Sequence, residues 1–274
     1  MSDSGSKDSK SSSGQKVRVP AKWFIDGFHR FLRRYLRRHF HCIAVDRASR
    51  PVSETGGERP LILFANHPSW WDPLIAQYLN RTLFDNRTFY APIDAEALEQ
   101  YKVFERLGFF GVRLSSKSGA AAFLANSRDV LDRPSAALWI TPEGQFSDVR
   151  DHTTPLMPGL AHLCHRSDDA DVMAVALEYA FWDERLPICF ASLSRPVTLS
   201  NHANWAKSDW SEFLSSQLRD AQRRLSELVV ARSPEPFDDL LTGKRGTGWF
   251  YDSSRRLKSA FTGKKFRASH GDQF

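Results

Sequence analysis

Two side chains in the first half of the chain have the types and spacing that acid–base chemistry needs. His67 and Asp72 are five residues apart, and Pro68 and Pro73 follow them directly. This spacing does not put both side chains on one face of a regular helix, so they meet only if the histidine lies in a turn and the aspartate begins a helix. An aspartate that accepts from one ring nitrogen leaves the other free to take a proton from an alcohol. Taken singly, Asp72 also fits a helix N-cap and His67 a hydrogen-bonded turn residue.

A second polar segment, Thr-Pro-Glu-Gly-Gln-Phe-Ser-Asp over residues 141–148, follows the apolar run 136–140. Residues 66–72 follow a similar run over 61–65, and we expect both runs to be buried strands. Active groups in open α/β sheets gather at the carboxyl ends of the strands. The sequence therefore predicts that the two segments contribute to one site.

Together these segments resemble the acylglycerol-phosphate and lysophospholipid acyltransferase family. His67 and Asp72, with Asn66 before them and Pro73 after, look like its H-x-x-x-x-D signature. Further matches follow in the family's order: residues 108–113 resemble its second block, residues 142–144 its Pro-Glu-Gly block, and residues 172–177 fall where a fourth, apolar block is expected. The resemblance covers residues 60–200.

The resemblance implies a role for each matching residue. His67 would be the general base and Asp72 would orient it. The positions that would bind substrate are Arg113, Glu143, Gly144, Asn66 and Ser69. Within this set, Arg113 would hold a phosphate or other anionic headgroup, a task suited to a permanently charged, planar fork. The family uses no metal and no cofactor, and the acyl group passes directly from a thioester to a hydroxyl.

The expected reaction takes the acyl group from acyl-CoA or acyl carrier protein to a lysophospholipid-like membrane lipid. The third block departs from the family, because Gln145 and Phe146 stand where threonine and arginine are usual. Loss of that cation keeps other acceptors open, such as an aminolipid, a glycolipid or a hydroxylated isoprenoid, although Arg150 is a nearby replacement. A hydrolase that uses the same base and a non-enzymatic membrane or nucleic-acid adaptor are further alternatives.

The elements that position these residues alternate along the chain. Strands are expected at 61–65, 88–92, 109–114, 136–140, 172–179 and 187–193, and helices at 74–79, 95–107, 120–131, 159–165 and 208–232. This alternation predicts a layered α/β domain with a mostly parallel or mixed central sheet flanked by helices. We interpret residues 42–60 as a polar connection.

A helix is also expected before this domain, over residues 17–41. Aromatic and leucine side chains recur there at helical spacing: Trp23, Phe24, Phe28, Phe31, Leu32, Tyr35 and Leu36. Arginines occupy the positions between them, and the whole chain has a formal net charge of +6. Such a helix lies well on an anionic membrane surface, and the pattern equally fits a helix that packs its stripe on the domain. Nucleic acid is not an expected partner, because no nucleic-acid-binding motif is present.

The ends of the chain differ from its middle. Residues 1–16 are predicted to be a disordered tail, 17–41 the membrane-surface helix, 42–232 the acyltransferase domain and 233–274 a basic extension. The tail lacks the apolar region of a signal peptide, and no apolar run reaches the roughly 18 residues of a spanning helix. Peripheral attachment at the cytoplasmic face of a membrane is therefore expected, and the three scattered cysteines fit buried thiols in a reducing compartment.

Overall fold

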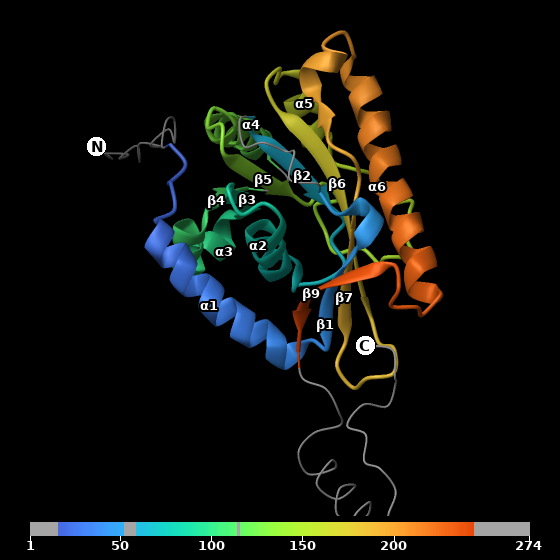
Figure 1. Cartoon of the computed structure of the whole chain (residues 1–274). Coiled ribbons are helices and arrows are strands. Elements are labelled where there is room, and N and C mark those ends of the chain that lie inside the picture. The colour runs from blue at the N-terminus through green and yellow to red at the C-terminus, as the bar shows by residue number, and fades with distance from the viewer. Residues whose placement is uncertain (1–15, 52–58, 114–115, 244–274) are drawn as a thin grey trace, which may run out of the picture.

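The computed structural model describes residues 16–51, 59–113 and 116–243 (Figure 1). The predicted tail, apart from its last residue, and most of the predicted extension lie outside these ranges. In the described part of the chain, nine strands form one sheet in the order β4-β3-β5-β2-β6-β7-β1-β9, with β8 paired to β6. The strands are β1 Cys42–Asp46, β2 Leu61–Ala65, β3 Thr88–Asp94, β4 Phe109–Val112, β5 Ala136–Ile140, β6 Asp171–Ala180, β7 Ile188–Leu193, β8 Val197–Thr198 and β9 Phe237–Thr242.

Helices connect most of these strands. The α-helices are α1 Lys22–His39, α2 Asp72–Leu83, α3 Ala95–Gln100, α4 Lys117–Leu131, α5 Pro158–His165 and α6 Lys207–Val230. Three short 3₁₀ helices are η1 Arg47–Ser49, η2 Lys102–Leu107 and η3 Leu199–His202. The strand pairs from β4 across to β6 are parallel, whereas β6 pairs antiparallel with β7 and β8, and β1 with β9. The predicted α/β class with a mixed central sheet is confirmed.

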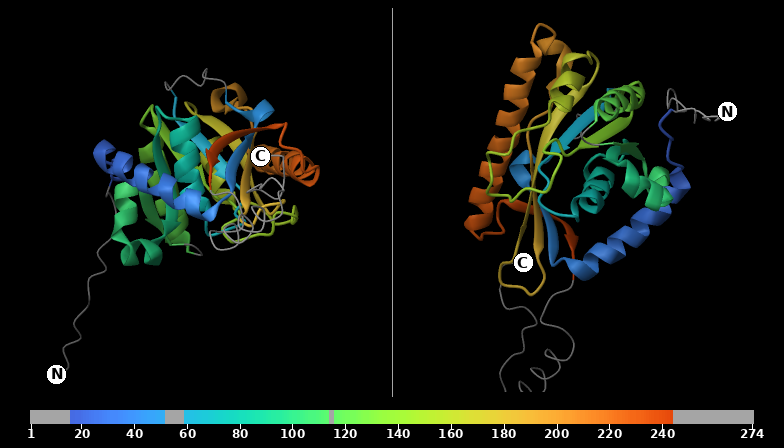
Figure 2. Two further views of the ribbon diagram at one scale, coloured as in Figure 1. Left: turned by 60° about the horizontal axis from the view of Figure 1, so that its bottom comes forward. Right: turned by 180° about the vertical axis from the view of Figure 1, so that it is seen from behind.

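The sheet is covered by helices on both faces, because side chains along each strand alternate between two cores. In β2, Leu61 and Leu63 pack into the core that α1 and α2 cover, and Ile62 and Phe64 pack into the core beneath α4, α5 and α6. All five β2 residues are buried, which explains why these strands are continuous apolar runs in the sequence. Seen from behind, α1 and α6 lie on opposite sides of the molecule (Figure 2).

Three strands lie where the sequence predicts none: the two-residue β8 (Val197–Thr198), β1 and β9. Residues 42–60 are not only a polar connection, since β1 (Cys42–Asp46) begins this segment, is buried throughout and pairs in parallel with β7. β9 (Phe237–Thr242) lies within the predicted basic extension and forms the edge of the sheet beside β1. Two aspartates interrupt the apolar pattern of β9. β1 is as long as β2, but no glycine or proline separates it from α1 in the sequence.

The predicted N-terminal amphipathic helix is present as α1, and its stripe is only partly covered. Leu32 and Leu36 are fully buried against the domain, while Trp23 is 71% exposed and Phe31 is 59% exposed. No helix in the described ranges combines the length and the apolar character that crossing a bilayer requires.

Candidate active site

The turn of residues 66–72, which we call the catalytic turn after its predicted role, connects the end of β2 to the start of α2. His67 Nδ1 lies 2.6 Å from Asp72 Oδ2, and Asp72 is the first residue of the helix. The imidazole is 18% exposed and the carboxylate 3% exposed. The two side chains therefore meet in the way the spacing predicts, with the histidine in the turn. With its Nδ1 proton donated to Asp72, His67 keeps Nε2 free to accept a proton.

Asp72 is fixed by more than the imidazole. The Ser69 backbone N–H donates to Oδ2 at 3.0 Å, and the Tyr179 hydroxyl donates to Oδ1 at 2.6 Å. Burial, and after it the neighbouring Cys189 and Asp72, raises the Tyr179 pKa well above its ordinary value of 10.0. The phenol thus stays a neutral donor, and Asp72 is held by three donors in a closed environment.

Asn66, which follows β2, forms hydrogen bonds with β6. Its side-chain amide donates to the Leu177 carbonyl at 2.9 Å, and its side-chain oxygen accepts from the Leu177 N–H at 2.8 Å. These two bonds extend the pairing of β2 with β6 by one residue. The side chain is buried by β6, and Ser69 likewise turns its hydroxyl to the Trp71 N–H. Neither residue is among those that line the cavity described below.

Glu143 contacts the backbone of His67 and does not face the cavity described below. Its Oε2 accepts from the His67 backbone N–H at 3.1 Å, and its Oε1 accepts from Arg219 on α6 at 2.8 Å. The Glu143 side chain is fully buried and does not line the cavity. The carboxylate that the resemblance assigns to the acceptor pocket is thus occupied by the protein itself.

Residues 144–147 close over the catalytic turn from the side of β5. Gly144 has a φ of +67°, a conformation that favours glycine, and an added Cβ would lie 2.3 Å from the Met157 sulfur. The Phe146 ring lies 4.4 Å from the His67 ring, centroid to centroid, and Phe146 is 61% exposed. The Ser147 N–H donates to the His67 carbonyl at 3.0 Å. His67 is consequently held on both sides of its peptide unit.

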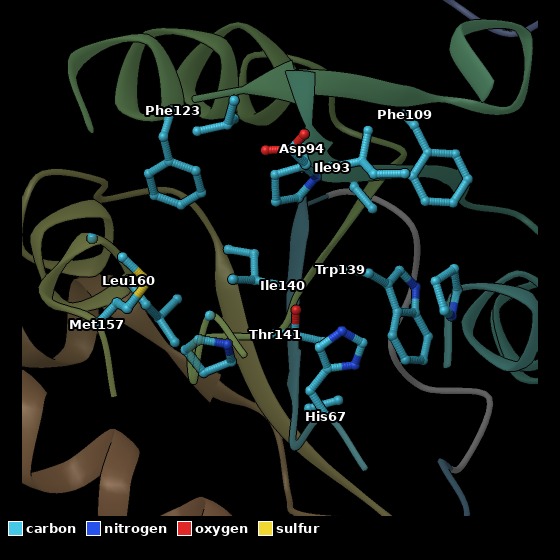
Figure 3. Close-up of a pocket in the computed structure, with 18 of the residues that line it drawn as sticks. His67, Ile93, Asp94, Phe109, Phe123, Trp139, Ile140, Thr141, Met157 and Leu160 are labelled. Carbon is cyan, nitrogen blue, oxygen red and sulfur yellow. The ribbon is translucent and has the colours of Figure 1, made fainter. Parts of the chain in front are cut away.

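An apolar cavity of about 600 Å³ opens beside His67. Its walls come from α2, from β2 to β6, and from the N-terminal halves of α4 and α5. Figure 3 shows the His67 ring and the Trp139 indole on one side, with Ile93 and Phe123 across from them. The volume falls within the range of ordinary small-molecule sites, about 300–1,000 Å³.

Charged side chains are few in this cavity. Among the described residues that line it, the ionisable ones are His67, Asp72, Asp94 and Arg113. Asp94 accepts from two N–H groups at the start of α3. Arg113 has no carboxylate partner among the described residues and is exposed at the end of β4. Arg113 and Gly144 are thus the two predicted substrate-binding residues that border the cavity.

Arg150 does not take the place of the cation that the third block lacks. Its guanidinium donates to both carboxylate oxygens of Asp148, at 2.8 and 2.7 Å. This pair lies outside the lining of the cavity, and its bonds hold the pKa of Asp148 well below the ordinary value.

Tyr179 and Arg219 were not among the residues that the sequence singles out. Tyr179 lies 107 positions from Asp72, and Arg219 lies 76 positions from Glu143. A tyrosine in a predicted strand and an arginine in a long amphipathic helix carry no local signal of such contacts. A buried position on α6 that holds an arginine was the one available clue, since arginine is seldom buried without a partner.

In this α/β fold a buried carboxylate bonds to a histidine at the mouth of an apolar cavity, an arrangement suited to acid–base chemistry. Residues 51–178 match the model of the Acyltransferase family. The match supports acyl transfer as the general function and includes both polar segments of the site. Tyr179, β7, α6 and β9 follow the matched segment, and α1 and β1 precede it. No curated protein gives a significant match to the chain.

Proposed function

We propose that the protein transfers a fatty acyl group from acyl-CoA or acyl carrier protein to the hydroxyl of a lysophospholipid-like lipid. The observation that carries this proposal is the 2.6 Å contact between His67 and Asp72 at the edge of a 600 Å³ apolar cavity. An acyl chain fills an apolar cavity favourably, because each buried methylene contributes about 0.8 kcal/mol.

In the proposed mechanism, His67 Nε2 removes the proton from the acceptor hydroxyl as the oxygen attacks the thioester carbonyl carbon. Collapse of the tetrahedral intermediate breaks the carbon–sulfur bond, and the imidazolium returns its proton to the leaving thiolate. Asp72 stabilises the imidazolium between these steps, and the Tyr179 and Ser69 donors keep its carboxylate in place. All atoms and charges balance without a metal or a covalent enzyme intermediate.

Roles for the remaining predicted residues follow from where they lie. Arg113 borders the cavity and is proposed to bind an anionic headgroup. Gly144 is proposed to leave room at the cavity wall, since a side chain there would collide with Met157. Asn66, Ser69 and Glu143 are proposed to position the catalytic turn, because their side chains bond to the protein outside the cavity.

One observation favours a second kind of acceptor. Phe146 covers His67 where a cation would be expected, and Arg150 is paired with Asp148. The acceptor hydroxyl would then approach His67 beside an aromatic ring and not beside a second positive charge. An aminolipid, a glycolipid or a hydroxylated isoprenoid meets this condition better than a phosphate monoester next to the hydroxyl.

We also propose that α1 holds the enzyme on an anionic membrane surface. Trp23 and Phe31 are exposed on it, and so are five arginines, Arg30, Arg33, Arg34, Arg37 and Arg38. None of these arginines forms an ion pair with another described residue. Replacing Trp23 and Phe31 with serine should weaken binding to vesicles with anionic lipids, and salt should weaken binding of the parent protein. Unchanged vesicle binding would remove α1 as the anchor.

The direct test of the reaction is an acceptor panel. Acyl-CoA and acyl carrier protein donors are each incubated with lysophospholipids, aminolipids, glycolipids and hydroxylated isoprenoids, and the products are identified by mass spectrometry. We expect a new ester on one acceptor class, with acceptor-dependent release of thiol. Release of free fatty acid alone would instead identify a hydrolase. An Arg113→Ala variant should raise the KM of an anionic acceptor more than the KM of the donor.

A further inference from the structure

Glu143 is a buried carboxylate whose two oxygens have separate partners. Oε2 accepts from the backbone N–H of His67 at 3.1 Å, and Oε1 accepts from the Arg219 guanidinium at 2.8 Å. The side chains of Glu143 and Arg219 are 0% and 7% exposed. The peptide group that carries the proposed base is therefore bonded to a carboxylate whose charge is balanced by an arginine from α6.

Arg219 bonds to a residue of its own helix and to two residues of the segment between β5 and α5. Besides Glu143, it donates to the Gln222 side-chain oxygen at 2.6 Å and to the Thr154 carbonyl. Thr154 belongs to the loop that runs from Gly144 to α5, and this loop also contains Phe146 and Ser147. Arg219 itself lies 41 positions beyond the segment that matches the family model, which ends at residue 178. One side chain of α6 thus fixes both the carboxylate behind His67 and the loop beside it.

We propose that Arg219 and Glu143 are positioning residues, and that this pair holds the His67 backbone so that the imidazole reaches both Asp72 and the acceptor. The inference rests on the proposed role of His67 as the general base. A buried ion pair contributes little net stability compared with an apolar pair of the same size, so stability alone is a weak reason for burying two charges here. A small displacement of a catalytic group, by contrast, lowers the rate by about 10²-fold for each 1 Å.

Two double variants separate positioning from stability. Arg219→Met with Glu143→Gln removes both charges and keeps a side-chain oxygen that accepts from the His67 N–H. Arg219→Met with Glu143→Leu also removes both charges but leaves that N–H without its acceptor. We expect similar melting temperatures, unchanged KM values, and a kcat about 10- to 100-fold lower for the leucine double variant. Equal kcat in the two double variants would overturn the proposal.

Arg219→Lys covers the case in which a double variant does not fold. It keeps the positive charge but lacks the planar fork that bonds to several acceptors at once. The expected result is a lower kcat with an unchanged KM at a temperature where the protein is fully folded. A lower melting temperature with unchanged kcat would show that the pair serves stability only.

Arg224→Met is the matched control on the same helix. Arg224 bonds to the buried Asp46 at the end of β1, and β6 and β7 lie between β1 and β2 in the sheet. We expect this variant to melt at a lower temperature and to keep its kcat. A loss of kcat as large as that of Arg219→Lys would show that activity follows stability, which would refute the positioning role. A fully active His67→Ala protein would instead refute the proposed function on which the inference rests.

Discussion

Asp72 and Glu143 are two buried carboxylates that contact the same histidine from different regions, and their surroundings differ. In the catalytic turn, the donors to Asp72 among the described residues, besides the imidazole, are both neutral: the Ser69 N–H and the Tyr179 hydroxyl. In the loop after β5, Glu143 is paired with the positive charge of Arg219. A carboxylate whose charge is balanced already responds little to a new charge on the imidazole. Asp72 is therefore suited to stabilise an imidazolium, and Glu143 to fix a peptide group.

The largest expected effect is that of Asp72→Asn. An amide at this position no longer favours the imidazolium and sets the wrong tautomer of His67, so kcat should fall by about 10²- to 10⁴-fold. The melting temperature should change little, because the side chain keeps its size and an oxygen for Tyr179. A steady-state assay and a melting curve check both expectations. A kcat near that of the parent protein would show that Asp72 does not stabilise an imidazolium in the reaction.

Glu143→Gln should instead lower the stability of the protein more than its kcat. Loss of one partner leaves the buried Arg219 without a counter-charge, which costs about 3–5 kcal/mol of stability. The remaining side-chain oxygen still accepts from the His67 N–H, so kcat at a temperature where the protein is folded should fall much less than in Asp72→Asn. Urea unfolding and an acyl transfer assay measure the two quantities. If kcat fell as far as in Asp72→Asn, the two carboxylates would share one role.

Tyr179→Phe should have a smaller effect on the rate. It removes one hydrogen bond to Asp72, and an intramolecular hydrogen bond contributes about 1 kcal/mol, or roughly fivefold in rate. Because burial raises the Tyr179 pKa, the stability that this phenol contributes is fully present below its ordinary pKa of 10.0 and is lost as pH rises through the raised value. Between pH 9 and pH 11 the melting temperature should therefore fall less steeply with pH in the variant than in the parent protein. Identical slopes in the two proteins would contradict a buried neutral phenol.

The smallest expected change is the labelling of Cys189 by an alkylating reagent in the native protein. This thiol lies behind Asp72, is fully buried, and has a pKa raised well above its ordinary value by that burial. Native protein treated with iodoacetamide at pH 8 should stay unmodified at Cys189, whereas unfolded protein should react fully. Mass spectrometry of the labelled peptides gives the result. Rapid labelling of the native protein would mean that water reaches the wall behind Asp72, against the closed environment described for it.

The sequence predicts those parts of the fold and the site whose signals are local. β2, β5 and β6 lie in the middle of the sheet and are buried on both faces, so they stand out as apolar runs. The acidic residues of β9 mask an edge strand, and β1 follows α1 without a glycine or proline to mark the boundary. His67, Asp72 and Gly144 belong to compact motifs that place them at strand ends. Tyr179 and Arg219 reach the site through contacts between residues far apart in the chain, which depend on the packing of β6 and α6 and leave no local pattern in the sequence.

The central claim is that His67 is the general base of an acyl transfer. Its most direct test is the single-turnover rate of transfer from acyl-CoA to the preferred acceptor, measured for the parent protein and for His67→Ala at equal folded fraction. We expect His67→Ala to transfer the acyl group about 10²- to 10⁴-fold more slowly, or slower still, while it binds both substrates. A variant that transfers the acyl group at close to the parent rate would contradict the central claim.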